Sequence, residues 1–276
     1  MRPTSKIVIG IILLIFSVSL AFIIGFSFTN RKNYSRHSNS NNIELPQDNM
    51  TSIELGSFKT IVIDEIPYKP EKSNFGIGTS GSVNFNSTPE KGKPDMLFIP
   101  ESLKDFIVIN TSDDTLKINL NMHELGHIHK FNDYDYCKIS GINMLFSVSK
   151  IDVINKLFNL SVNIENIETD SIRISSNGSV FIDSCKAQFI EPFLKARYQS
   201  LSITNCDVKR INLDCDHVRN WNIENSKIEE EHITGSGNHN ITLHHNESGR
   251  IKWVPKNDKA ELNIKIQGDT TEIIIQ

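Results

Sequence analysis

The sequence contains little cysteine and no excess of positive charge. Four cysteines among 276 residues are too few for the disulfide framework that stabilises small secreted domains. Lysine and arginine number 29 against 33 aspartates and glutamates, which gives a formal net charge of −4. A nucleic-acid-binding domain usually carries a basic patch or stripe, so we expect no nucleic acid among the partners. Hydrophobic residues form 38% of the chain, too few for a polytopic membrane protein but enough for a packed core.

Common catalytic and nucleotide-binding motifs are absent as well. The sequence has no G-x-S-x-G nucleophile elbow, no P-loop and no EF-hand loop. Residues 76–81 match G-x-G-x-x-G, but the pyrophosphate-binding form of that motif opens a helix, and residues 82–89 show no helical pattern. We therefore interpret these glycines as part of a loop that spans Tyr68 to Asp95, and we expect no cofactor.

A long apolar run lies at the N-terminus. Residues 7–28 carry no charge, and their polar side chains are Ser17, Ser19 and Ser27. A helix needs about 20 such residues to cross a bilayer, whereas the apolar part of a signal peptide is usually shorter. We predict that residues 1–30 form an uncleaved transmembrane anchor. Cleavage near Ser19–Ala21 is the alternative.

The anchor is followed by a polar segment and then by a β-rich domain. Residues 31–50 are rich in asparagine and serine and show no apolar period, so they bury too little surface to offset the entropy of ordering. We interpret them as a polar linker, with a disordered docking peptide as the alternative. Residues 51–276 are then the extracytoplasmic domain of a single-pass protein of the cell membrane.

Short strand patterns in the C-terminal half recur about every ten residues. Each unit is apolar–polar–apolar, as in Leu201–Ile203 and Ile211–Leu213, and is followed by polar, small or amide residues such as Asn205. Repetition at a fixed period indicates a solenoid, and short strands favour an all-β class with a β-solenoid of about two strands per coil. A sandwich of evenly spaced strands is the alternative. The inward positions expected to share one core are Val162, Ile174, Ile182, Ile203, Leu213, Ile223 and Leu243.

Other elements follow from local patterns. The turn at Thr111–Asp114 lies between two alternating runs, which predicts a hairpin. Cys185 and Cys206 are 21 residues apart, about one coil, and we expect them to be buried thiols, with a disulfide as the alternative. The acidic run Glu229–Glu231 is expected to be a solvated corner.

One segment matches a catalytic pattern. His123, Glu124 and His127 stand in H-E-L-G-H, in which two histidines on one helix face bind Zn²⁺ and the glutamate activates the metal-bound water. Here the motif directly follows an alternating strand, and Lys130 occupies the place of the glycine in the extended motif. We therefore expect a solvated loop, with no catalytic residue and no metal. The alternatives for the motif are an incidental metal-binding patch and the site of a membrane-anchored zinc metallopeptidase. For the chain as a whole, a β-helix carbohydrate-active enzyme with carboxylates on one face is a further alternative.

In its overall plan the chain resembles the auto-transporter adhesin head (GIN) domain proteins of Bacteroidetes. The likeness is carried by the strand Phe58–Ile63, the segment Asp114–Ile118, and the corners Ser175–Ser179 and Gly235–Asn238. It covers Thr51 to the C-terminus. The resemblance implies a β-solenoid at the cell envelope with no established activity. We therefore expect a membrane-anchored, non-enzymatic cell-envelope domain whose β-solenoid surface serves adhesion or binds an envelope protein or a glycan.

The length of the apolar run predicts that the mature protein keeps its N-terminal segment. Membrane fractionation and N-terminal sequencing test this, and we expect the chain in the membrane fraction with a first residue before Ile7. A mature protein that begins at Phe22 or Phe28 would show a cleaved signal peptide instead.

Overall fold

The computed structural model describes residues 40–276, apart from 48, 70–74, 88–92, 157–158, 197, 245–247, 268–271 and 276. The predicted anchor, residues 1–30, and residues 31–39 of the predicted linker lie outside the described residues. Within the described part of the chain, no helix has the length and apolar character needed to span a bilayer. The unit described below is Ser40–Gln276.

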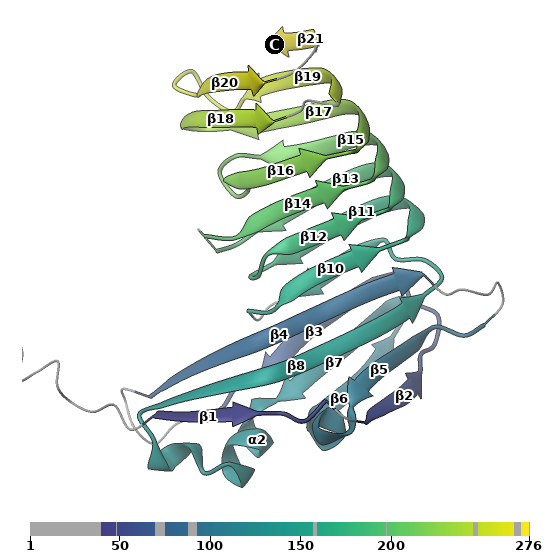
Figure 1. The fold of residues 1–276 in the computed structure, drawn as a ribbon, viewed down its shortest axis with the longest axis vertical. Coiled ribbons are helices and arrows are strands. Elements are labelled where there is room, and N and C mark those ends of the chain that lie inside the picture. Colours follow the sequence, from purple (N-terminus) through teal and green to yellow (C-terminus); the bar gives the residue numbers. More distant parts are fainter. Residues whose placement is uncertain are drawn as a thin grey trace, which may run out of the picture. The chain divides into compact units, whose positions relative to one another are not determined.

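The described residues fold into three sheets and three short helices (Figure 1). Sheet A contains β1 (Ser40–Glu44), β2 (Met50–Glu54), β4 (Gly76–Ser87), β5 (Met96–Pro100), β8 (Tyr136–Val148), β10 (Ser161–Glu165), β12 (Val180–Asp183), β14 (Ser200–Thr204) and β16 (Asn220–Glu224). Sheet B contains β3 (Thr60–Ile66), β6 (Ile107–Ser112), β7 (Thr115–Asn121), β9 (Val153–Lys156), β11 (Glu168–Ser176), β13 (Lys186–Leu194), β15 (Asp207–Asp214), β17 (Lys227–Gly235), β19 (Ser248–Pro255) and β21 (Glu272–Ile275). Sheet C pairs β18 (Asn238–His244) with β20 (Glu261–Gln267), and the helices are η1 (Glu101–Phe106), α2 (Met122–Ile128) and η2 (Phe131–Asp133). The predicted all-β class is confirmed.

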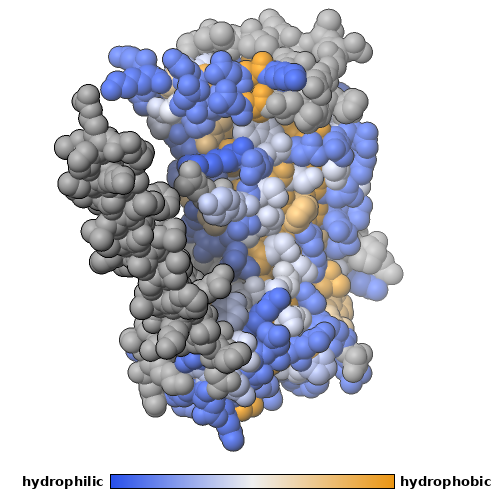
Figure 2. All heavy atoms as spheres, turned by 60° about the vertical axis from the view of Figure 1, so that its left-hand side comes forward, coloured by the Kyte–Doolittle hydropathy of each residue, from blue (hydrophilic) through white to orange (hydrophobic). Residues whose placement is uncertain are grey.

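From β10 to β17 the chain alternates between sheets A and B. Each strand pairs in parallel with the strand two positions along, so that Val162 lies beside Val180, Val180 beside Leu201, and Leu201 beside Trp221. Figure 1 shows the resulting coils stacked on one another, each with one strand in sheet A and one strand in sheet B. The apolar core lies between the two sheets. Figure 2 shows one side of the molecule, on which hydrophilic residues predominate and hydrophobic ones appear between them.

The repeat pattern identified the core positions correctly. Six of the seven predicted residues are at most 9% exposed and belong to one continuous cluster: Val162, Ile174, Ile182, Ile203, Leu213 and Ile223. The side chain of Leu243 lies outside the described part. The predicted hairpin is also confirmed, because β6 and β7 pair antiparallel with Ser112 opposite Thr115.

Each coil turns from sheet A into sheet B at a residue with a left-handed backbone. These four residues have φ between 49° and 58°: Asn166, Ser184, Asn205 and Asn225. Asparagine is enriched in this conformation. The backbone N–H of Ser184 donates to the carbonyl of Thr204 at 3.0 Å, and that of Asn205 to the carbonyl of Glu224 at 3.1 Å. The corners are therefore hydrogen-bonded from one coil to the next.

A buried small residue follows each of the last three corners. The N–H of Cys185 donates to Sγ of Cys206 at 3.4 Å, and the N–H of Cys206 donates to Oγ of Ser226 at 3.1 Å. Both thiols are free and buried, as expected. The neighbouring thiol of Cys206 together with burial raises the pKa of Cys185, so this side chain stays a neutral thiol. Cys206 thus accepts a backbone hydrogen bond as well as filling space, and the thiol of Cys185 donates to the carbonyl of Asp183 at 3.2 Å.

The structure corrects the loop expected at residues 76–81. These residues belong to β4, which pairs with β8 along its whole length. The ring of Tyr136 on β8 lies over Gly76 and Gly78. A side chain at Gly78 would collide with it, and one at Gly76 would be in tight contact with it. Gly81 has φ of 154° at a register shift in the ladder. The glycines therefore allow β8 to pack closely against β4.

The linker expected at residues 31–50 is ordered at its C-terminal end. Residues Ser40–Glu44 form β1, which pairs in parallel with β8. Ile43 and Leu45 are 7% and 4% exposed, and the N–H of Leu45 donates to the carbonyl of Ser140 at 3.0 Å. Two buried apolar side chains are enough to order this segment because β8 offers a strand edge with which β1 can pair.

Glu231 stands in a column of buried isoleucines, which corrects the solvated corner expected for Glu229–Glu231. Parallel pairing aligns Ile190, Ile211, Glu231 and Ile251 on successive strands. Glu231 is 1% exposed; Oε1 accepts a hydrogen bond from Ser248, and Oε2 has no partner among the described residues. Burial raises the pKa of Glu231 from 4.5 to about 6, against the opposing effect of the Ser248 hydrogen bond.

The buried carboxyl predicts that stability falls as pH rises. Since the folded-state pKa of Glu231 is above its unfolded value, its favourable contribution is complete below pH 4.5 and is lost as pH rises through about 6. A difference of this size corresponds to about 2 kcal/mol. We expect Glu231→Gln to raise the free energy of unfolding by about that amount at pH 7.5, with little effect at pH 4.

Urea unfolding of the full chain at the two pH values measures this effect. Glu229→Gln is the matched control, because Glu229 is exposed on the same strand and its replacement should leave the pH profile unchanged. An equal response of the two variants would contradict the assignment to Glu231.

Candidate functional site

The H-E-L-G-H motif lies on α2, so the loop expected there was wrong. Oδ1 of Asn121 accepts a hydrogen bond from the N–H of Glu124 at 3.1 Å and caps the helix. Leu125 and Gly126 are buried, and the rings of Tyr68 and Phe131 pack so closely on Gly126 that a side chain there would collide with them. A cap and close packing, rather than a long helical pattern, form this helix.

The two histidines of the motif are exposed and lie beside Tyr68. The ring centroids of His123 and His127 are 4.6 Å apart, and each lies about 6 Å from that of Tyr68, at 6.3 and 6.4 Å. Among the described residues, no group of three or more histidine, cysteine, aspartate or glutamate side chains is placed to hold a metal. A structural zinc site uses four protein ligands and a catalytic site three. Glu124 is exposed as well, and the two histidines form an aromatic cluster with Tyr68, whose ring packs on Gly126.

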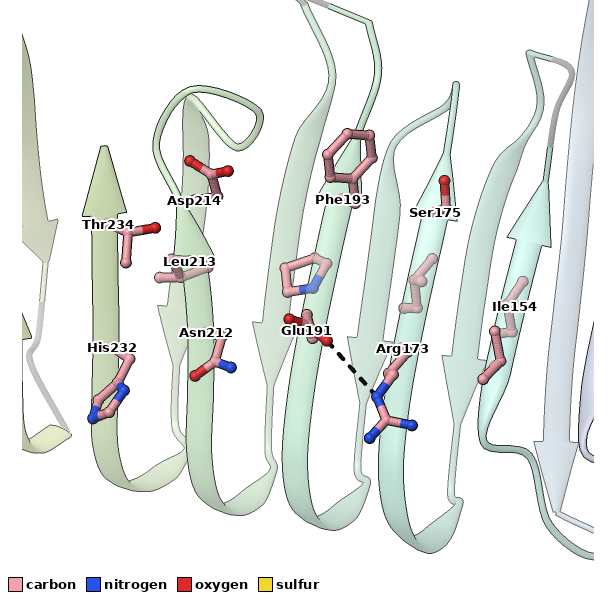
Figure 3. Close-up of a pocket in the computed structure, with 13 residues that line it drawn as sticks. Ile154, Arg173, Ser175, Glu191, Phe193, Asn212, Leu213, Asp214, His232 and Thr234 are labelled. Carbon is pink, nitrogen blue, oxygen red and sulfur yellow. Dashed lines mark ion pairs between the residues drawn. The ribbon is translucent and has the colours of Figure 1, made fainter. Parts of the chain in front are cut away.

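A different feature brings functional groups together on sheet B. An open hollow of about 450 Å³ lies over β11, β13, β15 and β17 (Figure 3). Its polar lining alternates along the strands with buried residues, as the pleat requires. The main contributors are Arg173 and Ser175 on β11, Glu191 and Phe193 on β13, and Asn212 and Asp214 on β15. We call this feature the sheet B hollow.

Pro192 accounts for the position of the hollow. Pairing of β13 with β15 runs from Lys186 opposite Asp207 to Ile190 opposite Ile211 and ends there. On its other side β13 stays paired with β11, and Pro192 lies opposite Ile174. Proline has no N–H to donate to a ladder. The sheet therefore opens between the ends of β13 and β15, where the hollow lies.

The charged groups of the hollow are paired with one another or with close neighbours. Nε of Arg173 lies 3.7 Å from a carboxylate oxygen of Glu191, the pair marked in Figure 3. Nζ of Lys256 lies 2.6 Å from Asp214. Although burial opposes it, hydrogen bonds to Asp214 and Asp216 raise the pKa of Lys256, so the cation persists at neutral pH. The lining thus carries charges that are locally balanced.

Two uncharged side chains of the lining, Phe193 and Asn212, differ in their surroundings from ordinary exposed strand residues. Phe193 is 36% exposed, and its ring centroid lies 4.0 Å from that of His217. Oδ1 of Asn212 is shielded from solvent and has no hydrogen-bond partner among the described residues. Such an atom is costly to leave unsatisfied and usually has a partner in water or a ligand.

Sequence reasoning did not identify this hollow. Its residues come from strands about one coil apart, and each side chain alone resembles an ordinary exposed strand residue. Pro192 was the available signal, because a proline in the middle of an apolar alternating run marks an interruption of the ladder.

Comparisons with known proteins identify the fold. No family model matches the chain, and no curated protein matches it significantly in sequence. The crystal structure of a protein from Bacteroides fragilis, described as "a putative adhesin", is 17% identical, with a TM-score of 0.51 over 85% of this chain and 100% of that chain. The Bacteroides fragilis protein therefore has the same fold as the chain described here. Structures from Parabacteroides merdae ("a putative adhesin") and Parabacteroides distasonis ("Putative lipid binding protein") are 12% and 14% identical, with TM-scores of 0.35 and 0.37, each over 85% of this chain and 99% of its own.

The exposed histidine pair predicts that the motif is not a catalytic zinc site. We expect metal analysis of the purified full chain to find no stoichiometric zinc, and Glu124→Gln to match the wild type in a peptidase assay, because two histidines leave the ion short of a third protein ligand. Zinc near one ion per chain, with a peptidase activity that disappears in Glu124→Gln, would overturn this prediction.

Proposed function

We propose that this chain is a non-enzymatic, adhesin-like protein of the cell envelope that binds a partner through the sheet B hollow. Residues 1–30 anchor it in the membrane, and the domain that follows is displayed outside the membrane. The observation that carries the proposal is the hollow itself, where outward side chains of β11, β13 and β15 converge on an exposed aromatic ring and an unsatisfied amide.

The architecture supports display rather than catalysis. We interpret the stacked parallel coils as a β-solenoid, in which each coil rests on its neighbours and holds outward side chains in fixed rows. The two carboxylates of the hollow, Glu191 and Asp214, are each engaged by a basic side chain. Such an arrangement suits binding by fixed polar groups around an aromatic residue.

The shared fold supports the same role. The Bacteroides fragilis structure with this fold is described as "a putative adhesin". Together with the sequence likeness described above, this favours membership of the chain among GIN-domain envelope proteins.

Adhesion of beads coated with the full chain tests the proposal. The beads are applied to immobilised mucin and to isolated bacterial envelopes, and retention under flow is measured. Ser175→Arg places a long side chain in the hollow, and we expect it to weaken adhesion about tenfold or more, which corresponds to about 1.4 kcal/mol.

Ser202→Arg is the matched control. Ser202 is a half-buried serine that points outward from β14 on sheet A, as Ser175 does from β11 on sheet B. Adhesion by the wild type and by Ser202→Arg, with loss in Ser175→Arg, supports the proposal. Absence of adhesion to either surface, or an equal loss in both variants, contradicts it.

A further inference from the structure

We infer that the sheet B hollow binds an uncharged pyranose ring of a glycan. This inference rests on the proposed function and names the class of ligand for the same site. The volume of about 450 Å³ falls within the range of small-ligand sites, and the hollow is not a broad apolar face of the kind that buries another protein.

The aromatic group is placed to receive one face of a sugar ring. Phe193 projects from the end of β13 and remains 36% exposed although its ring contacts His217. His217 limits the movement of the phenyl ring, so little side-chain entropy is lost on binding. The face of an aromatic ring carries a negative electrostatic potential and attracts the slightly positive C–H groups on one side of a pyranose.

The polar groups around Phe193 match hydroxyl groups. Asn212 lines the hollow with an amide group that can donate as well as accept. Ser175 and Thr234, on β11 and β17, add hydroxyls that both donate and accept. A carboxylate has about four acceptor positions, so Glu191 can accept further hydroxyl donors beyond its contact with Arg173.

The balance of charge favours a neutral ligand. The cations nearest the hollow already face carboxylates, Arg173 with Glu191 and Lys256 with Asp214. His232 lies 2.6 Å from Glu230, whose pKa is lowered, against burial, by that hydrogen bond and by Arg210. An anionic sugar would need one of these pairs to separate, whereas an uncharged sugar does not.

Ligand-detected NMR on the full chain tests the inference directly. The probes are the methyl glycosides of glucose, galactose, mannose and N-acetylglucosamine, and the chain is kept in a zwitterionic detergent whose headgroup contains no sugar. We expect saturation transfer to at least one glycoside. Binding should weaken about tenfold or more in Phe193→Ala and recover in Phe193→Tyr, which restores the aromatic face.

Phe181→Ala is the matched control, because Phe181 is an exposed phenylalanine, 42% accessible, on β12 of the other sheet. Its binding should equal that of the wild type, and thermal unfolding confirms that all variants fold. No transfer to any of the four glycosides overturns the inference. An equal loss in Phe181→Ala and Phe193→Ala overturns it as well.

Periodate treatment of the adhesion surface separates this inference from the proposed function. Periodate cleaves the vicinal diols of sugars and leaves polypeptide backbones intact. Adhesion that disappears after treatment and is competed by the bound glycoside supports a sugar ligand. Adhesion that survives treatment but is still lost in Ser175→Arg overturns the sugar ligand, leaves the proposed function standing and indicates a peptide partner.

Discussion

Each coil must turn at the same place as the coil beside it, and the rest of the fold depends on this constraint. A residue with a left-handed backbone makes the turn, and its N–H bonds to the next coil, as Ser184 does to Thr204. Side chains alternate between the two faces of a strand, so a shift of one residue at a corner would carry core side chains to the surface. The same alternation projects Arg173, Glu191 and Asn212 outward. Corners far from the sheet B hollow therefore fix its composition.

Features that repeat from coil to coil could be predicted from the sequence. An apolar–polar–apolar triplet recurs about every ten residues, and the alternation within each triplet indicates which side chains point inward. This alternation is a local property of each strand, and it correctly placed Ile182 and Ile203 in the core. The hairpin at Thr111–Asp114 was likewise visible, since turn residues stand between two alternating runs.

Features that depend on a distant packing partner could not be predicted. Gly76 and Gly78 resemble loop residues until Tyr136, about 60 positions away, is placed over them. Gly126 has the same relation to Tyr68, and that contact stabilises the short helix α2 together with the Asn121 cap. Glu231 looks solvated within an acidic run until its pairing with Ile211 and Ile251 on the neighbouring strands is known. The sheet B hollow also depends on residues far apart in the sequence, because Pro192 on β13 interrupts the hydrogen bonding to β15, which lies one coil further along.

The buried carboxyl of Glu231 makes the interfaces between neighbouring coils unequal in stability. In a stack where each coil contacts its neighbours alone, stability is close to a sum of coil and interface terms, and one weak interface limits cooperativity. The interface around Glu231 joins β15 to β17 and β17 to β19 through a column that is otherwise isoleucine. Ionisation of Glu231 at neutral pH therefore weakens the contacts of β17 with the strands on either side of it. We therefore expect the amide hydrogens of β17 and β19 to exchange before those of β13 and β15.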